Sequence, residues 1–337
     1  MDKIPPIATF RSGCAGARHI VGLSGAMDAF SPDEPYSRLY MLNERASSAW
    51  TFNEHRFVVP AICLWRDPRQ GGARSFAALG ENGVVVMLGS ETRYENIADG
   101  GLGRPGAAGY GYLSGLRQVG EHLYACGYAG QVYKRHDADD WRHIDGGLLQ
   151  SVGIGDGGYA PLVIDGPNEH AIYIAGSENR RGFPARADHW DGMQWKRLIL
   201  PPEARRLTNI LVESAERVWL AGSNGTLLLG NATDGFRNVA PLGEKKLLLS
   251  VALYNGVGYL ATNVGLFKFD PTRPGAGFVK VRTGLVPELQ DANVVQSVEG
   301  VLWALGSKDL ARFDGNAWQR FHHPDNPSIQ VGAAAVP

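Results

Sequence analysis

The feature that most constrains the fold is a short phrase that recurs along the chain. An apolar and aromatic run ends at a glycine, a turn follows, and a second apolar run leads to an Asp-rich turn and another aromatic residue. The clearest copies are residues 218–225 and 302–309, and fainter ones lie at 123–130, 172–176 and 258–265. A recurrence with a period in the forties is typical of four-stranded propeller blades. The repeat therefore predicts an all-β fold built from such blades.

The turns within the repeat indicate how the strands connect. Glycines recur three positions apart after the aromatic run, and the Asn-Gly pairs at 82–83 and 224–225 predict two-residue hairpins. Asp-Gly turns at 191–192 and 314–315 are each followed by an aromatic residue, which we expect to begin the outermost strand and pack between blades. Seven positions fit this description: Trp50, Tyr94, Trp141, Trp195, Phe236, Phe278 and Trp318.

We therefore predict one seven-bladed propeller domain of four-stranded antiparallel blades over residues 1–337. The blades are expected at approximately 1–57, 58–103, 104–147, 148–201, 202–242, 243–285 and 286–337. A ring with an unpaired edge between its first and last blades is prone to aggregation. We expect residues 6–10 or 328–336 to supply a strand beside the other terminus's blade, and the sequence does not choose between them.

Residues 219–227, 259–270 and 303–314 resemble the propeller repeats of the two-component regulator type. The resemblance implies a blade and not an activity. Repeats of that type usually lie outside the membrane, ahead of a signalling module. This sequence offers neither an apolar stretch of membrane-helix length nor room for a kinase, so the resemblance supports the fold and weakens a sensor-kinase interpretation.

Composition excludes several function classes. The chain has 33 basic and 34 acidic residues and a formal net charge of −1, which gives no general field for nucleic acid or an anionic membrane. Its three cysteines, Cys14, Cys63 and Cys126, are an odd number without CxxC spacing, as expected of free thiols in a reducing compartment. The amino terminus has no apolar run of signal-peptide length. We therefore expect a cytoplasmic protein.

No motif in the sequence predicts catalysis, a cofactor or a metal site. Two GxGxxG matches, at 101–106 and 153–158, lack the helix that a dinucleotide site needs, so we expect loops between blades. The acidic cluster at 137–140 lacks the later ligands of a calcium loop. Adjacent His322 and His323 would point to opposite faces of a strand and cannot chelate one metal there. There is no GxSxG elbow, HExxH motif or P-loop.

The segment that departs most from the repeat is the turn at 177–189 in the fourth predicted blade. It is longer than the corresponding turns and carries Arg180, Arg181, Phe183 and Arg186. Arginine beside an aromatic residue is typical of interface hot spots, and function concentrates in loops on rigid scaffolds. We predict these four residues as a protein-partner site. A second irregular segment, residues 27–36, is acidic and proline-rich.

The leading prediction is a non-catalytic, protein-binding propeller, such as a bacterial accessory or immunity protein that binds and blocks a toxin. Two alternatives remain open. One is a metal-dependent hydrolase or lyase with its site in the central channel, and the other is a carbohydrate-binding propeller with exposed Trp and Tyr.

Overall fold

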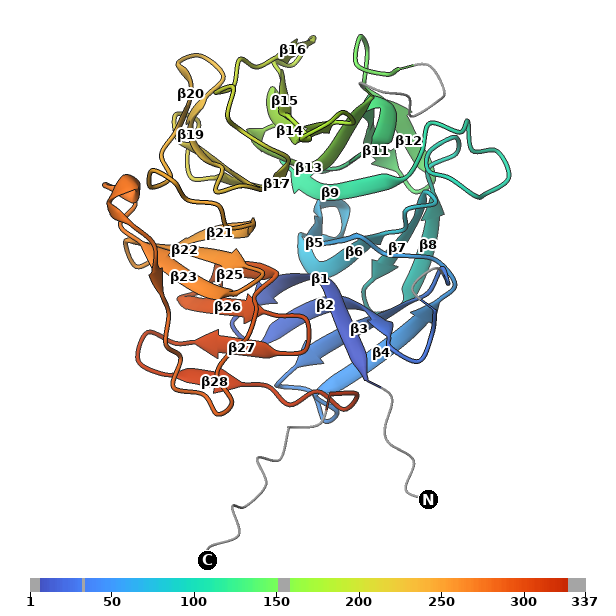
Figure 1. Ribbon diagram of the computed structural model, residues 1–337. Coiled ribbons are helices and arrows are strands. Elements are labelled where there is room, and N and C mark those ends of the chain that lie inside the picture. The colour runs from blue at the N-terminus through green and yellow to red at the C-terminus, as the bar shows by residue number, and fades with distance from the viewer. Residues whose placement is uncertain (1–6, 32–33, 151–157, 327–337) are drawn as a thin grey trace, which may run out of the picture.

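A computed structural model describes residues 7–31, 34–150 and 158–326, and these residues form a ring of seven four-stranded antiparallel sheets (Figure 1). In every sheet, neighbouring strands in space are also neighbours in sequence. The first strand of each sheet lies at the centre of the ring and the fourth at its rim. The predicted fold class, a seven-bladed propeller with four-stranded antiparallel blades, is therefore confirmed.

The strands of blades one to four are β1 (Ala8–Ala17), β2 (Ile20–Met27), β3 (Ser37–Asn43), β4 (Trp50–His55), β5 (Ala61–Asp67), β6 (Ala73–Leu79), β7 (Val84–Leu88), β8 (Thr92–Asn96), β9 (Leu113–Val119), β10 (His122–Gly127), β11 (Gln131–Asp137), β12 (Asp140–His143), β13 (Tyr159–Asn168), β14 (Ala171–Glu178), β15 (Ala185–Trp190) and β16 (Trp195–Arg197). Those of blades five to seven are β17 (Leu207–Val212), β18 (Val218–Gly222), β19 (Leu227–Asn231), β20 (Gly235–Asn238), β21 (Leu248–Tyr254), β22 (Val257–Thr262), β23 (Gly265–Phe269), β24 (Val279–Lys280), β25 (Val294–Val298), β26 (Val301–Leu305), β27 (Leu310–Phe313) and β28 (Trp318–Arg320). The described helical turns are the short 3₁₀ segments η1 (Pro68–Gln70), η2 (Tyr128–Gly130) and η3 (Pro274–Ala276).

The hydrophobic core lies between neighbouring blades. Every residue of β18 and of β26 is buried, because both faces of these second strands are covered by adjacent sheets. Trp219 of β18, for example, is fully buried and packs with Phe267 and Phe269 of the next blade. This two-sided burial explains why the apolar runs in the repeat are continuous rather than alternating.

The seven repeat aromatics lie in the outermost strands or immediately before them. Six of them pack into the core between their own blade and the preceding one, namely Trp50, Trp141, Trp195, Phe236, Phe278 and Trp318. Tyr94 differs, since it is 54% exposed and its ring only meets that of His55 in blade one. The expectation of interblade packing is thus wrong for Tyr94 and confirmed for the other six rings.

One predicted hairpin illustrates the backbone requirement. Asn224 and Gly225 have φ angles of 55° and 69°, the pattern of a type I′ turn between β18 and β19. A Cβ atom on Gly225 would lie 2.3 Å from the carbonyl oxygen of Glu244 in the neighbouring connection. Glycine is needed at position 225 because a side chain there would collide with this backbone oxygen, and glycine adopts the positive φ without strain.

The ring closes without exchange of a strand among the described residues. Residues 8–10 belong to β1, which pairs with β2 inside blade one, and blade seven is complete with β25 to β28. The expectation that residues 6–10 add a strand to the last blade is therefore wrong, and residues 328–336 lie outside the described residues. Closure uses main-chain and side-chain contacts instead. The Phe10 N–H donates to Ser307 O at 2.8 Å, and the Ala15 N–H donates to Gln296 Oε1 at 2.7 Å.

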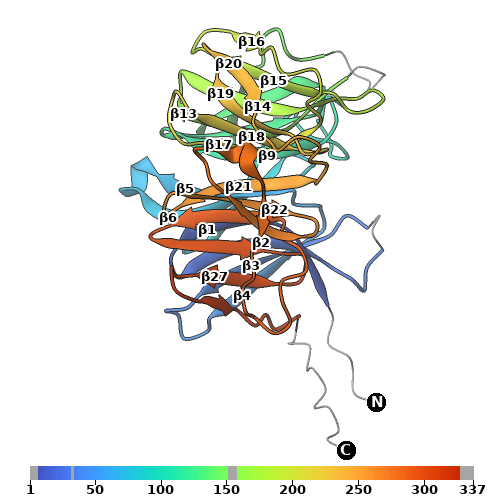
Figure 2. The ribbon, with the colours of Figure 1, turned by 60° about the vertical axis from the view of Figure 1, so that its left-hand side comes forward.

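Aromatic packing completes this closure seam between blades one and seven. The buried ring of His323, just after β28, contacts Phe10, Tyr40 and Trp50 with centroid separations of 5.2, 4.3 and 4.6 Å. With the ring turned by 60°, β1 to β4 of blade one and β27 of blade seven lie together (Figure 2). Blades one and seven each take their four strands from one stretch of the chain. The two blades pack face to face, so within the described residues the ring closes without a strand from the other terminus.

Candidate functional site

The predicted partner-binding segment forms a defined loop at residues 179–184, between β14 and β15. The Glu178 N–H donates to Pro184 O at 3.0 Å and the Phe183 N–H donates to Arg180 O at 2.9 Å. Gly182 and Phe183 have positive φ angles of 82° and 45°. The Arg206 N–H of blade five donates to Phe183 O at 2.9 Å, so the loop is fixed to the next blade as well as to its own.

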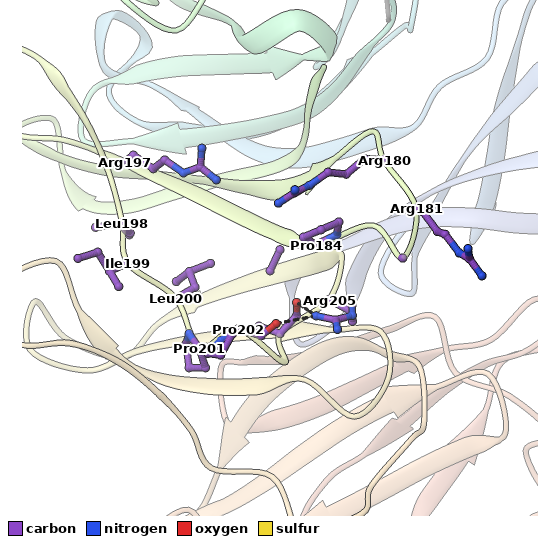
Figure 3. Close-up of a pocket in the computed structure, with 13 residues that line it drawn as sticks. Arg180, Arg181, Pro184, Arg197, Leu198, Ile199, Leu200, Pro201, Pro202 and Arg205 are labelled. Carbon is purple, nitrogen blue, oxygen red and sulfur yellow. Dashed lines mark hydrogen bonds between the residues drawn. The ribbon is translucent and has the colours of Figure 1, made fainter. Parts of the chain in front are cut away.

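This loop forms one wall of a groove between blades four and five, with a volume of about 610 Å³ (Figure 3). We call it the arginine groove. Four arginines line it, and the apolar run 198–202, with two prolines, forms the opposing wall. The complete lining is Arg180, Arg181, Gly182, Pro184, Ala185, Arg197, Leu198, Ile199, Leu200, Pro201, Pro202, Ala204 and Arg205. The Arg180 and Arg197 side chains extend toward each other, while Arg181 extends away from the apolar wall.

Positive charge in the arginine groove exceeds the negative charge beside it. The Glu178 carboxylate pairs with Arg180 at 2.7 Å and also with Arg197. Arg205 instead donates from Nη1 to the carbonyl oxygens of Pro202 and Ala204 at 2.8 and 2.9 Å. Among the described residues, Arg181 has no hydrogen bond or ion pair. In the described part of the chain, Glu178 is the one carboxylate that pairs with any of these four guanidinium groups, and the surface is complementary to an acidic ligand.

The apolar wall is unusually accessible. Ile199 is 92% exposed, although it lies between Leu198 and Leu200, which pack against the interblade core. An exposed aliphatic residue beside exposed arginines combines the apolar and bidentate contacts found at protein interfaces. Such a surface suits a protein segment better than a small polar metabolite.

The structure brings three of the four predicted residues to one surface. Arg180 and Arg181 line the groove, and Phe183 lies at the loop tip with 49% exposure. Arg186 is placed elsewhere: it lies within β15, its side chain is 13% exposed, and its Nε contacts Asp188 at 3.0 Å. Its guanidinium also lies 4.0 Å from the Tyr159 ring centroid. Arg186 therefore supports the blade from inside.

Sequence reasoning missed Arg197, Ile199 and Arg205. A signal for them existed, since residues 198–202 form an apolar and proline-rich run, directly preceded by Lys196 and Arg197, where a polar connection between blades is usual. This run lies beside the loop at 179–184 because it continues from β16 along β15, where the Leu198 N–H donates to Ala187 O at 3.0 Å and the Ala185 N–H donates to Ala204 O at 3.2 Å.

The second irregular segment lies at the closure seam. Phe30 and Tyr36 pack with ring centroids 4.5 Å apart, and Asp28 pairs with Lys308 of blade seven at 2.5 Å. Residues 32–33 lie outside the described residues. The segment is three blades away from the arginine groove, so the two do not form one site.

The remaining candidates from the sequence are placed as follows. Residues 101–106 lie in the loop between β8 and β9, and residues 153–157 lie outside the described residues. Within residues 7–31, 34–150 and 158–326, no group of three or more His, Cys, Asp or Glu side chains is arranged to hold a metal ion. Burial raises the pKa of Cys14, Cys63 and Cys126, which disfavours reactive thiolates. No helix in the described part of the chain is long and apolar enough to cross a membrane.

Comparison with known proteins gives one informative relative. The chain is 29% identical over 252 residues to "Immune protein Tsi7" of Pseudomonas aeruginosa strain PAO1, a match that covers 72% of this chain and 74% of that protein. No protein-family model matches. The resemblance to two-component regulator propellers therefore stays a prediction.

Similar solved structures show the fold alone. The WD40 propeller domain of Doa1 matches with a TM-score of 0.59 and 8% identity, over 96% of this chain and 98% of that chain. PorZ, a surface component of the type-IX secretion system of Porphyromonas gingivalis, matches with a TM-score of 0.60 and 11% identity, over 95% of this chain and 39% of that chain. These identities are too low to carry function.

Proposed function

We propose that this protein is a bacterial immunity protein that binds and blocks a protein toxin. The observation that carries the proposal is the similarity to Immune protein Tsi7, which extends over about three quarters of both chains. A match of that extent spans several blades, and so reflects more than one shared repeat. The described residues add no metal-ligand group that would favour the alternative of a channel hydrolase.

We place the partner contact at the arginine groove, with Phe183 at its edge. Arg180 and Arg181 present guanidinium groups that suit bidentate contacts to carboxylates, and Ile199 offers an exposed aliphatic contact. The partner segment that fits is acidic and carries at least one apolar side chain. The rigid loop supports this role, because a preformed surface loses little conformational entropy on binding.

A cytoplasmic location belongs to the same proposal. The chain has three buried cysteines without a disulfide, as is typical of proteins in a reducing compartment: Cys14, Cys63 and Cys126.

The test begins with affinity capture from the native host, using the full tagged chain and a variant with Arg180→Glu and Arg181→Glu. The captured partner is identified by mass spectrometry and expressed alone in a bacterial host. We expect it to stop growth by itself and to be tolerated when the wild-type chain is present.

The variant then separates the function from the surface. A partner that is harmless when expressed alone would contradict the immunity function. A harmful partner blocked equally by wild type and variant would leave the function standing and remove the groove as its site. Arg237→Glu in β20 is the matched control, since Arg237 is exposed on blade five and does not line the groove.

A further inference from the structure

The central channel contains polar side chains that lie apart from the arginine groove. The first strands of the blades line two cavities with volumes of about 510 and 630 Å³. Five residues line both cavities and so mark the level at which they meet: Arg117, Asn209, Ile210, Ser250 and Gln296. The polar members come from blades three, five, six and seven, which surround the axis of the ring.

Two carboxamides at this level are held in a fixed orientation. Asn209 Oδ1 accepts the Val251 N–H at 3.1 Å, and Gln296 Oε1 accepts the Ala15 N–H at 2.7 Å. Each oxygen is thereby committed to the next blade, and the amide NH₂ is the end left toward the channel. Neither NH₂ group has a partner among the described residues, so both are available as donors.

Arg117 adds a charged donor at the same level. Its Nη2 lies 3.1 Å from Asp165 Oδ2, and its side chain is 42% exposed, so the guanidinium reaches the open channel. Its other N–H groups have no partner in the described part of the chain. A guanidinium has five N–H donors in a planar fork, and one ion pair leaves most of them free.

The mouths of the channel carry excess positive charge. Arg11 lines one cavity and Arg66 lines the other, both with exposed side chains. The acidic lining residues are already compensated, Asp165 by Arg117 and Glu213 by Arg217 at 3.0 Å. The channel thus attracts anions although the whole chain has a net charge of −1.

From these observations we infer that Arg117, Asn209 and Gln296 form a donor ring that binds one small oxyanion, such as phosphate or a carboxylate, in the channel. The geometry selects an anion over a cation. A metal ion needs oxygen ligands, and each carboxamide oxygen already accepts a backbone N–H, whereas the two NH₂ groups and the Arg117 guanidinium can only donate. Phosphate and carboxylate oxygens accept several such hydrogen bonds at once.

Isosteric substitutions test this ring without loss of the interblade hydrogen bonds. Asn209→Asp and Gln296→Glu keep the oxygen that accepts from the next blade and replace the donor NH₂ by a second carboxylate oxygen. We expect isothermal titration of the full chain with inorganic phosphate to show one site, and each variant to weaken binding at least tenfold. Melting temperatures measured in parallel establish that the variants are folded.

Further arms exclude the exposed arginines and identify the source of the anion. Arg180→Gln with Arg181→Gln removes two groove charges, and Arg237→Gln is a matched surface control; both are expected to retain phosphate binding. Phosphate binding that survives both isosteric variants, or that is absent from wild type, would overturn the proposal. Acetate in place of phosphate tests a free carboxylate. Loss of the captured partner with Asn209→Asp would instead assign the oxyanion to an acidic side chain of that partner.

Discussion

Arginine side chains are paired and mostly buried at the closure seam, whereas they are exposed and only partly paired in the arginine groove. At the seam, Arg38 is 13% exposed and pairs with Glu54 and with Asp325 at 2.7 Å, while its guanidinium lies 4.4 Å from the Phe52 ring centroid. In the groove, Arg181 is exposed and has no partner among the described residues, and Arg180 shares one carboxylate with Arg197. The number of carboxylates per guanidinium, together with burial, decides whether an arginine joins two blades or remains available to another molecule.

The largest expected difference between the regions concerns packing. Trp303 of β26 is 3% exposed, and its Nε1 donates to Ala17 O across the seam at 3.3 Å. We expect Trp303→Ala to lower the free energy of unfolding by about 4 kcal/mol, because it leaves a cavity between blades seven and one. Urea unfolding measures this. Ile199→Ala in the groove is the counterpart and is expected to change stability by less than about 0.5 kcal/mol. Equal losses would show that the groove is part of the core.

Acid is expected to weaken the seam more than the groove. Burial lowers the pKa of His323 to about 4, and its Nδ1 accepts the Asp325 N–H at 3.0 Å. The unfolded chain binds a proton near pH 6.5 and the folded chain only near pH 4, so stability falls as the pH drops through this window. The loss approaches about 3 kcal/mol at pH 4.

His323→Phe isolates this contribution, because it keeps an aromatic ring among Phe10, Tyr40 and Trp50 and removes the titrating group. We expect the melting temperature of the variant to decline less between pH 6.5 and 4 than that of wild type. Parallel curves would contradict a role for His323. The groove double variant Arg180→Glu with Arg181→Glu should follow the wild-type curve, since it removes no buried histidine.

Partner binding should show the reverse pattern. For Arg180→Glu with Arg181→Glu we expect a loss of partner affinity of at least tenfold, with the loss greatest at low salt, because exposed charges are screened. Surface plasmon resonance with the captured partner measures both effects. Arg38→Lys at the seam serves as the contrast and should leave affinity unchanged. An equal loss of partner affinity in Arg38→Lys would indicate that the partner binds near blade one.

The smallest expected effect concerns arginine geometry. Arg312 pairs with Glu44, donates to Gln319 Oε1 at 2.8 Å, and lies over the rings of Trp303 and Phe321. Lysine cannot keep this fork and its stacking, so we expect Arg312→Lys to cost about 1 kcal/mol in thermal or urea unfolding. Arg181→Lys should have no measurable effect on stability. If Arg312→Lys leaves the free energy of unfolding unchanged, the positive charge alone, without the guanidinium geometry, stabilises this part of the seam.

Much of the fold could be predicted because the repeat is local. Continuous apolar runs, glycine turns and outer aromatic residues specify each blade within about forty residues, and six of the seven outer aromatic residues pack between blades as expected. The prediction of interblade packing was wrong for Tyr94, because its ring faces β4 of blade one and that strand is mostly exposed. The prediction that residues 6–10 add a strand to the last blade was wrong for a similar reason. Closure depends on contacts between residues about three hundred positions apart, such as Phe10 and Ser307.

The candidate site was predictable only in part. The loop at 179–184 stands out from the repeat, so the sequence singles out Arg180 and Arg181, which line the groove, and the exposed Phe183; their role in partner binding stays a prediction. Arg186 was grouped with them because the sequence does not show that the strand β15 has already begun at Ala185. Arg197 reaches the groove because β16 pairs with β15 inside blade four. Arg205 reaches it because the connection to blade five forms a bridge with Pro184. Neither placement follows from a local sequence pattern.

The sequence by itself determined the seven blades, since each is stabilised by turns and apolar runs that are close together in the chain. Tertiary structure settles which arginines pair with carboxylates among the described residues, how the ring closes, and which carboxamide groups line the channel. These features depend on contacts between blades, and the number of compensating groups around a charge becomes fixed only when the blades are packed.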